Sequence, residues 1–146
     1  MKDILIVLNR SNNEHVVEEA CRVAQSDSKK VKALQILDSG LYFYGHNDLV
    51  APRLSKRTFL LYIREQVIEQ GKIEAGELRE KAHDMGISLD IDPIETDDVI
   101  ATVIAEAQKG YGQIYLAKEE RKLFPLLKRH LARQLRKNVF AKVIEC

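Results

Sequence analysis

The sequence predicts an α/β protein: a three-layer α/β/α sandwich around a five-stranded, mostly parallel sheet of strand order 3-2-1-4-5. Strand-like and helix-like segments alternate along the 146 residues, the pattern that parallel sheets produce. The first strand-like run, at residues 3–8, is apolar after one charge and suits the centre of a sheet. Two later runs, at residues 87–94 and 139–144, alternate or carry charge, so they are expected at the edges.

Length and composition fit one soluble domain covering residues 1–146. The chain is 45% apolar and 31% charged, which is typical of globular proteins and not of disordered or membrane-embedded ones. No apolar run approaches the roughly 20 residues that a membrane-spanning helix needs. The two cysteines, Cys21 and Cys146, lie far apart and form no disulfide framework or metal-ligand spacing. We therefore expect a cytoplasmic protein with two reduced thiols.

The first half of the chain predicts two strands and two helices. After the first strand, Ser11 and the residues that follow it supply helix caps, and the helix they open ends near residue 30. A second strand spans residues 31–37, and residues 38–57 are expected to be irregular. A long helix over residues 58–85 contains Gly71 and Gly76, which suggest a bend or a close contact with the sheet. Gly86 is expected to stop this helix.

The second half predicts three strands and two helices. Residues 87–94 alternate strictly and contain Pro93, so they read as an edge strand. Thr96 to Asp98 cap the next helix, residues 113–117 form a fourth strand, and Pro125 opens the last helix. The fifth strand covers Val139 to Ile144.

Strand order predicts where a ligand would bind. In open α/β sheets, ligands occupy the crevice beyond the carboxyl ends of the strands at the point where the order reverses. In the predicted sheet this point lies between strands one and four. It places Asn9, Arg10 and Ser11 opposite Ala117 and Lys118.

Several segments of the chain match one known family in order and spacing. The first strand is followed by Asn9-Arg10-Ser11, where that family has Asp-Gly-Ser. Residues 35–38 match the end of its second strand loosely, and residues 112–117 take the place of its fourth strand. Residues 130–135 and 142–144 correspond to its last helix and last strand. Over nearly its full length the chain therefore resembles the universal stress protein family, and the resemblance implies the adenine nucleotide alpha hydrolase-like fold.

The nucleotide-binding residues of that family are missing here. Its ATP-binding members carry Gly, two spacers, Gly, nine spacers and then Gly-Ser or Gly-Thr after strand four, because glycines let backbone N–H groups approach phosphates. No glycine follows Gly112 in this chain, Arg129-His130 takes the Gly-Ser position, and Asn9 replaces the acidic residue that contacts the nucleoside. The chain is therefore similar to the branch of the family that does not bind ATP, and no cofactor is expected.

The resemblance leads to one main hypothesis and two alternatives. The main one is a non-enzymatic stress-response or regulatory protein that acts through homodimerisation and protein contacts. The family commonly dimerises through its last strand, which predicts an interface at Val139, Ala141, Val143 and Ile144. The first alternative is binding of a nucleotide or other anion by the side chains of Asn9, Ser11, Lys118 and Arg129. The second is a hydrolase or transferase, which fold alone does not exclude.

Other clusters have simpler explanations than a site. The four histidines never pair at helical spacing or near a cysteine, so no metal site is expected. Residues 118–142 hold nine Lys/Arg and two Glu, an excess of +7. On the last helix, Arg129, Arg133 and Arg136 share one face opposite an apolar stripe, which is either a solvated surface or an anion-binding ridge. Nucleic acid is disfavoured because no aromatic side chains are interleaved with these cations. The aromatic run Tyr42 to Tyr44 either binds a partner or covers the sheet edge.

Overall fold

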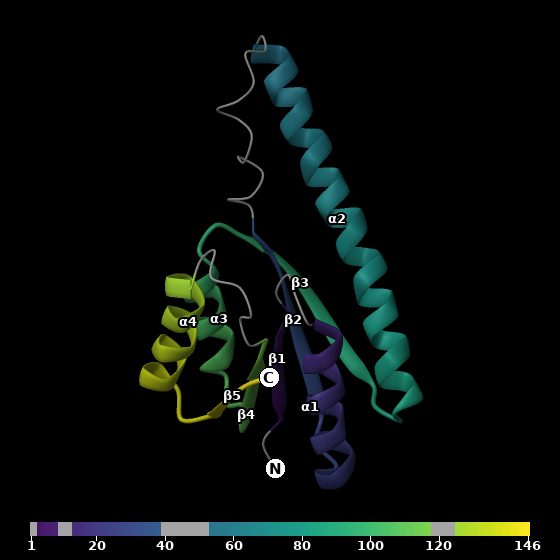
Figure 1. Ribbon diagram of the computed structural model, residues 1–146, viewed down its shortest axis with the longest axis vertical. Helices are drawn as coiled ribbons and strands as arrows, with labels where there is room; N and C mark the ends of the chain where they lie inside the picture. The colour runs from purple at the N-terminus through teal and green to yellow at the C-terminus, as the bar shows by residue number, and fades with distance from the viewer. Residues whose placement is uncertain (1–2, 9–12, 39–52, 118–124) are drawn as a thin grey trace.

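The computed structural model confirms the predicted architecture and describes residues 3–8, 13–38, 53–117 and 125–146. Five parallel strands form one sheet in the order β3-β2-β1-β4-β5. Helices α1 and α2 cover one face and α3 and α4 the other (Figure 1). In chain order the elements are β1 Ile4–Leu8, α1 Asn13–Asp27, β2 Val31–Asp38, α2 Arg53–Asp84, β3 Leu89–Thr96, α3 Val99–Ala107, β4 Gln113–Leu116, α4 Pro125–Asn138 and β5 Lys142–Glu145.

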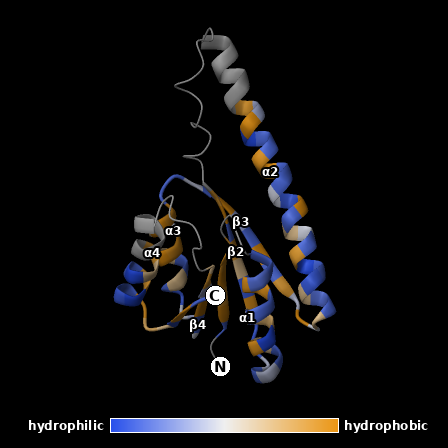
Figure 2. Cartoon of the chain, viewed as in Figure 1, coloured by the Kyte–Doolittle hydropathy of each residue, from blue (hydrophilic) through white to orange (hydrophobic). Residues whose placement is uncertain are grey.

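Strand β1 lies at the centre of the sheet because all five of its side chains are apolar. Its residues are at most 2% exposed, and Figure 2 shows the strand as hydrophobic between helices that are mixed in character. One side of β1 packs with α1 and α2, and the other packs with α3 and α4. Burial on both faces is the condition under which a strand can be apolar throughout.

The boundaries of three segments differ from the prediction. Helix α2 begins at Arg53, so residues 53–57, expected to be irregular, are helical. Strand β3 starts and ends two residues later than predicted. The fifth strand is shorter than predicted, since Val139 to Ala141 form the turn before β5. Val139 to Ala141 are apolar and resemble a strand, but they connect α4 to β5. The limits of α2 and β3 differ by the few residues that are commonly uncertain at the ends of an element.

Helix α2 lies close to the sheet at Gly71. A Cβ atom there would lie 3.3 Å from the side chains of Gln35 and Leu37 on β2. The buried Gln35 side chain donates a hydrogen bond from Nε2 to the Gly71 carbonyl at 2.8 Å. The predicted glycine contact with the sheet is therefore confirmed at Gly71, whereas a Cβ at Gly76 would have no neighbour within 4 Å. Gly86, at φ +77°, follows the end of the helix as predicted.

Within the described ranges, no helix combines the length and the apolar character needed to cross a membrane.

Candidate functional site

The carboxyl ends of β1 and β4 lie side by side, as the predicted crevice requires. The two strands pair in parallel, with Val7 opposite Leu116 at their last paired position. Strand order reverses at this point, since β2 continues on one side of β1 and β4 on the other. Of the four residues predicted to hold a ligand here, Asn9, Ser11 and Lys118 lie outside the described residues. Arg129 lies on α4, but its side chain is also outside the described part.

The predicted dimer interface lies on the sheet edge formed by β5. Val139, Ala141 and Val143 are half-buried against the α3–α4 side of the core, and Ile144 is half-buried against the α1–α2 side. Phe140, in the turn that leads into β5, is fully exposed. A large exposed aromatic side chain beside an open strand edge adds apolar surface at the place where another chain could pair.

The backbone of β5 shows which of its groups face outward. The Lys142 N–H donates to the Gly112 carbonyl at 3.0 Å, and the Cys146 N–H donates to the Leu116 carbonyl at 2.8 Å. In a parallel pair, successive residues direct their N–H and C=O groups to alternate sides of the strand. Val143 and Glu145 therefore present their backbone groups away from β4, at the open edge.

The opposite edge of the sheet, formed by β3, is protected. Proline has no N–H to donate. Because β3 pairs with β2 along its whole length, the nitrogen of Pro93 must face outward, away from β2. Ile91, two residues earlier, has the same orientation, and its carbonyl accepts a hydrogen bond from Arg79 Nη2 at 3.3 Å. Two successive outward positions on β3 are thus unable to pair fully with another strand.

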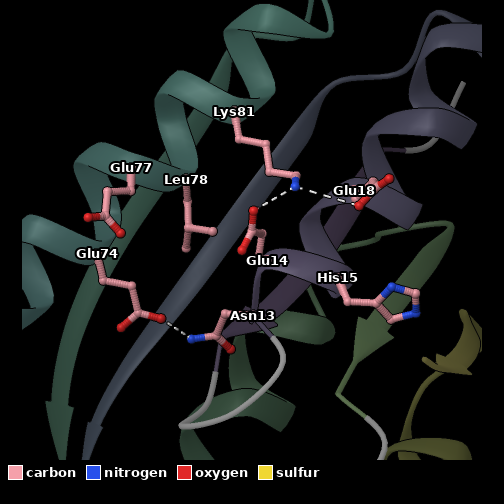
Figure 3. Close-up of a pocket in the computed structure, with 8 residues that line it drawn as sticks. All are labelled: Asn13, Glu14, His15, Glu18, Glu74, Glu77, Leu78 and Lys81. Carbon is pink, nitrogen blue, oxygen red and sulfur yellow. Dashed lines mark hydrogen bonds and ion pairs between the residues drawn. The ribbon is translucent and has the colours of Figure 1, made fainter.

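A groove of about 780 Å³ lies between α1 and α2, and the sequence did not predict it. Four carboxylates line it: Glu14 and Glu18 from α1, and Glu74 and Glu77 from α2 (Figure 3). Lys81 contacts Glu14 at 2.8 Å and Glu18 at 3.6 Å. This contact lowers the pKa of Glu14.

The first turn of α1 is held against α2 beside this groove. The Asn13 side chain is 7% exposed and donates a hydrogen bond from Nδ2 to Glu74 Oε1. Asn13 is the first residue of α1, and α1 follows the segment that leaves the carboxyl end of β1. The groove therefore lies beside the start of the helix that follows β1.

A buried carboxylate, Glu106, lies near the opposite end of the sheet. Its side chain is 7% exposed and forms ion pairs with Lys32 Nζ at 2.9 Å and Lys109 Nζ at 2.7 Å. It also accepts a hydrogen bond from the Tyr111 hydroxyl at 2.8 Å. Burial opposes its ionisation, but the hydrogen bonds from Lys109, Lys32 and Tyr111 outweigh burial and lower its pKa to about 2. Burial, and then the bond to Glu106, raise the pKa of Tyr111. The cluster ties the end of α3 to β2.

Among the described residues, no three His, Cys, Asp or Glu side chains are arranged to hold a metal ion. Cys21 and Cys146 are free thiols, and burial raises the pKa of Cys21 to about 11. A thiol with a raised pKa is a poor nucleophile.

Several solved structures that resemble this chain in fold are universal stress proteins. A member of that family from Burkholderia pseudomallei is 14% identical, with a TM-score of 0.70 over 99% of this chain and 95% of that chain. For UspA from Lactobacillus plantarum the identity is 14%, the TM-score 0.71 and the coverage 99% and 96%. The chain has the universal stress protein fold. A universal stress protein from Archaeoglobus fulgidus in complex with dAMP is 11% identical, with a TM-score of 0.63 and coverage of 99% and 97%. No protein-family model and no curated protein sequence matches the chain.

Proposed function

We propose that this protein is a universal stress protein of the branch without ATP binding, and that it acts as a cytoplasmic homodimer that contacts other proteins and catalyses no reaction. The difference between the two sheet edges is the main support for the homodimer. At β3, Pro93 and the Arg79–Ile91 contact obstruct strand addition, whereas β5 leaves the backbone groups of Val143 and Glu145 facing outward. Unpaired strand edges favour pairing with another chain.

The proposed interface is an antiparallel pairing of two β5 strands. A two-fold axis normal to the sheet reverses the strand direction and keeps each face of the sheet continuous across the dimer. Val143 on one face and Ile144 on the other would then be covered by the second copy, together with Phe140 in the preceding turn. These side chains supply the apolar burial that the short β5 edge needs in addition to backbone hydrogen bonds.

A proline substitution tests this edge directly. Because the Val143 N–H faces outward, Val143→Pro removes a donor of the interface and leaves the hydrogen bonds of Lys142 and Cys146 to β4 in place. We expect light scattering at micromolar concentration in 500 mM NaCl to give twice the 16.7 kDa chain mass for the wild type and one chain mass for the variant.

The matched control is Val143→Ala, which removes side-chain contact but keeps the N–H. It is expected to dimerise more weakly than the wild type and more strongly than Val143→Pro. Circular dichroism should show that all three proteins are folded. A wild-type monomer at these concentrations, or a proline variant that remains dimeric, would contradict the proposed interface.

The absence of ATP binding rests on the sequence beyond Gly112, which holds no glycine to let backbone N–H groups surround phosphates. We expect no change in melting temperature with millimolar ATP, since only a ligand that binds the folded state stabilises it. A clear upward shift with ATP would overturn this part of the proposal. We also expect no release of phosphate from ATP, and turnover would restore the hydrolase alternative.

The alternative of ligand binding is favoured by two structures with the same fold, one in complex with dAMP and one in complex with cAMP. In this chain a nucleotide or other anion would have to be held by the side chains of Asn9, Ser11, Lys118 and Arg129. Thermal shifts with AMP or sulfate, but not with ATP, would support this alternative. The variant Lys118→Ala should then abolish the shift.

A further inference from the structure

The helices on the two faces of the sheet differ in charge. Helix α4 contains five Lys/Arg and no acidic residue. Helix α1 contains four acidic residues and one arginine. Helix α2 is nearly neutral over its length, with seven Lys/Arg and six Asp/Glu, but its Glu74 and Glu77 line the groove beside α1. Because α1 and α4 lie on opposite faces of the sheet (Figure 1), their charges are separated across the thickness of the molecule.

The basic surface of α4 is exposed in its last two turns. Arg133 and Lys137 are both exposed and lie four residues apart, a rise of about 6 Å along one side of a helix. Arg136 is 54% exposed and lies 3.9 Å from Glu145. At this distance and exposure the pair with Glu145 is weak, so the surface retains most of its positive charge.

The groove between α1 and α2 has the complementary charge. Among the described residues that line it, Lys81 supplies the one ammonium group against four carboxylates. Lys81, on α2, contacts Glu14 and Glu18 of α1, and Figure 3 shows Glu77 on the other side of Leu78, away from this ion pair. An arginine or lysine entering from outside would therefore meet a concave surface whose described residues carry a net charge of −3.

We propose that the α4 surface of one copy, made by Arg133, Arg136 and Lys137, docks into the α1–α2 groove of a second copy. Guanidinium groups pair well with carboxylates because two parallel N–H donors match two oxygens. The contact joins two different surfaces, so it does not close on itself as a two-fold interface does and can add further copies. It uses none of the apolar residues of the proposed β5 interface, although Arg136 lies beside Glu145 of β5, and it does not depend on the proposed dimer.

Salt dependence is the first test of this contact. We expect sedimentation velocity in 20 mM NaCl to show species larger than the β5-paired or single-chain form, and 500 mM NaCl to dissociate them, since exposed charges are screened at high ionic strength. Samples with and without prior nuclease treatment are compared. A mass that is the same at both salt concentrations overturns the proposal, as does an increase that disappears with nuclease.

Charge reversal provides the second and more specific test. Arg133→Glu removes the basic surface and keeps the groove, and Glu77→Lys does the opposite. Each variant alone is expected to self-associate at least about tenfold more weakly at low salt, because each replaces attraction by repulsion. An equimolar mixture is expected to recover association with one-to-one stoichiometry, since the intact groove of one variant fits the intact helix of the other.

The control is Glu69→Lys, which makes the same change of charge on α2 at a residue that is 64% exposed and is not among the groove residues. It is expected to associate like the wild type. A mixture of Arg133→Glu and Glu77→Lys that fails to associate overturns the proposal. So does a loss of association in Glu69→Lys as large as in Glu77→Lys.

Discussion

Replacing Glu106 by glutamine should destabilise the protein in a manner that depends on pH. The buried carboxylate has a pKa of about 2 in the folded chain, against a usual value of 4.5. A lowered pKa means that the folded state favours the ionised form. The contribution of Glu106 to the unfolding free energy is therefore complete at pH values above its pKa in the unfolded chain. It is lost as the pH falls through its pKa in the folded chain. The pKa shift corresponds to about 3 kcal/mol of unfolding free energy at pH 7, and roughly half of this contribution is lost by pH 3.

Urea unfolding of the wild type and Glu106→Gln at pH 7, 5 and 3 measures this contribution. Other carboxylates titrate in both proteins, so the difference between their unfolding free energies isolates Glu106. We expect a difference of about 2–3 kcal/mol at pH 7, because glutamine still accepts a hydrogen bond from Tyr111 but leaves the Lys32 ammonium without its closest carboxylate. By pH 3 the difference should fall to about half.

The control is Glu69→Gln, which removes a carboxylate that is 64% exposed and lies 3.3 Å from Lys72. Such exposed pairs contribute little, so this variant should unfold within about 0.5 kcal/mol of the wild type at every pH. A Glu106→Gln difference that is the same at pH 7 and pH 3 would show that the carboxylate stabilises the fold by packing and not by its charge.

Four further predictions concern helix α2 and the buried core. Gly71→Ala should lower the unfolding free energy by about 1–3 kcal/mol, because its Cβ would lie 3.3 Å from the Gln35 side chain. Gly76→Ala should raise the unfolding free energy by about 0.5–1 kcal/mol, because open space surrounds that position and alanine favours helix. Thermal unfolding of the two variants should therefore show a lowered melting temperature for Gly71→Ala and a raised one for Gly76→Ala. Leu135→Ala, at a fully buried site on α4, should cost about 2–5 kcal/mol in urea unfolding. Cys21 should resist Ellman's reagent at pH 8 in the folded protein and react in urea, since burial raises its pKa to about 11.

The strand order was predictable because the burial of a strand determines which of its residues are apolar. A strand covered on both faces must be apolar at every position, as β1 is, and a strand with Pro93 in it must lie at an edge. The cap of α3 was predictable because it involves residues three positions apart: Asp98 accepts a hydrogen bond from the Ala101 N–H at 3.1 Å. Each of these features depends on residues close together in the chain.

The groove and the Glu106 cluster were not predictable because they join distant elements. The spacing of Glu14 and Glu18 on one helix, and of Glu77 and Lys81 on another, reads as ordinary charged helix surface. Nothing in the sequence shows that Lys81 lies between the two glutamates of α1. Glu106 likewise reads as the partner of Lys109 at a helix end, and its burial becomes apparent only when Lys32 on β2 is placed against it.

Salt should separate the two proposed modes of assembly, because they depend on different forces. The β5 edge uses backbone hydrogen bonds and apolar side chains, which persist at 500 mM NaCl, whereas the α4–groove contact depends on charge. At high salt the wild type and Arg133→Glu should therefore both be two-chain species, and Val143→Pro should be a monomer. At low salt Val143→Pro should still self-associate through α4, whereas a protein with both substitutions should stay monomeric. If Arg133→Glu were monomeric at high salt, the basic surface would belong to the β5 interface, and the two contacts would be one.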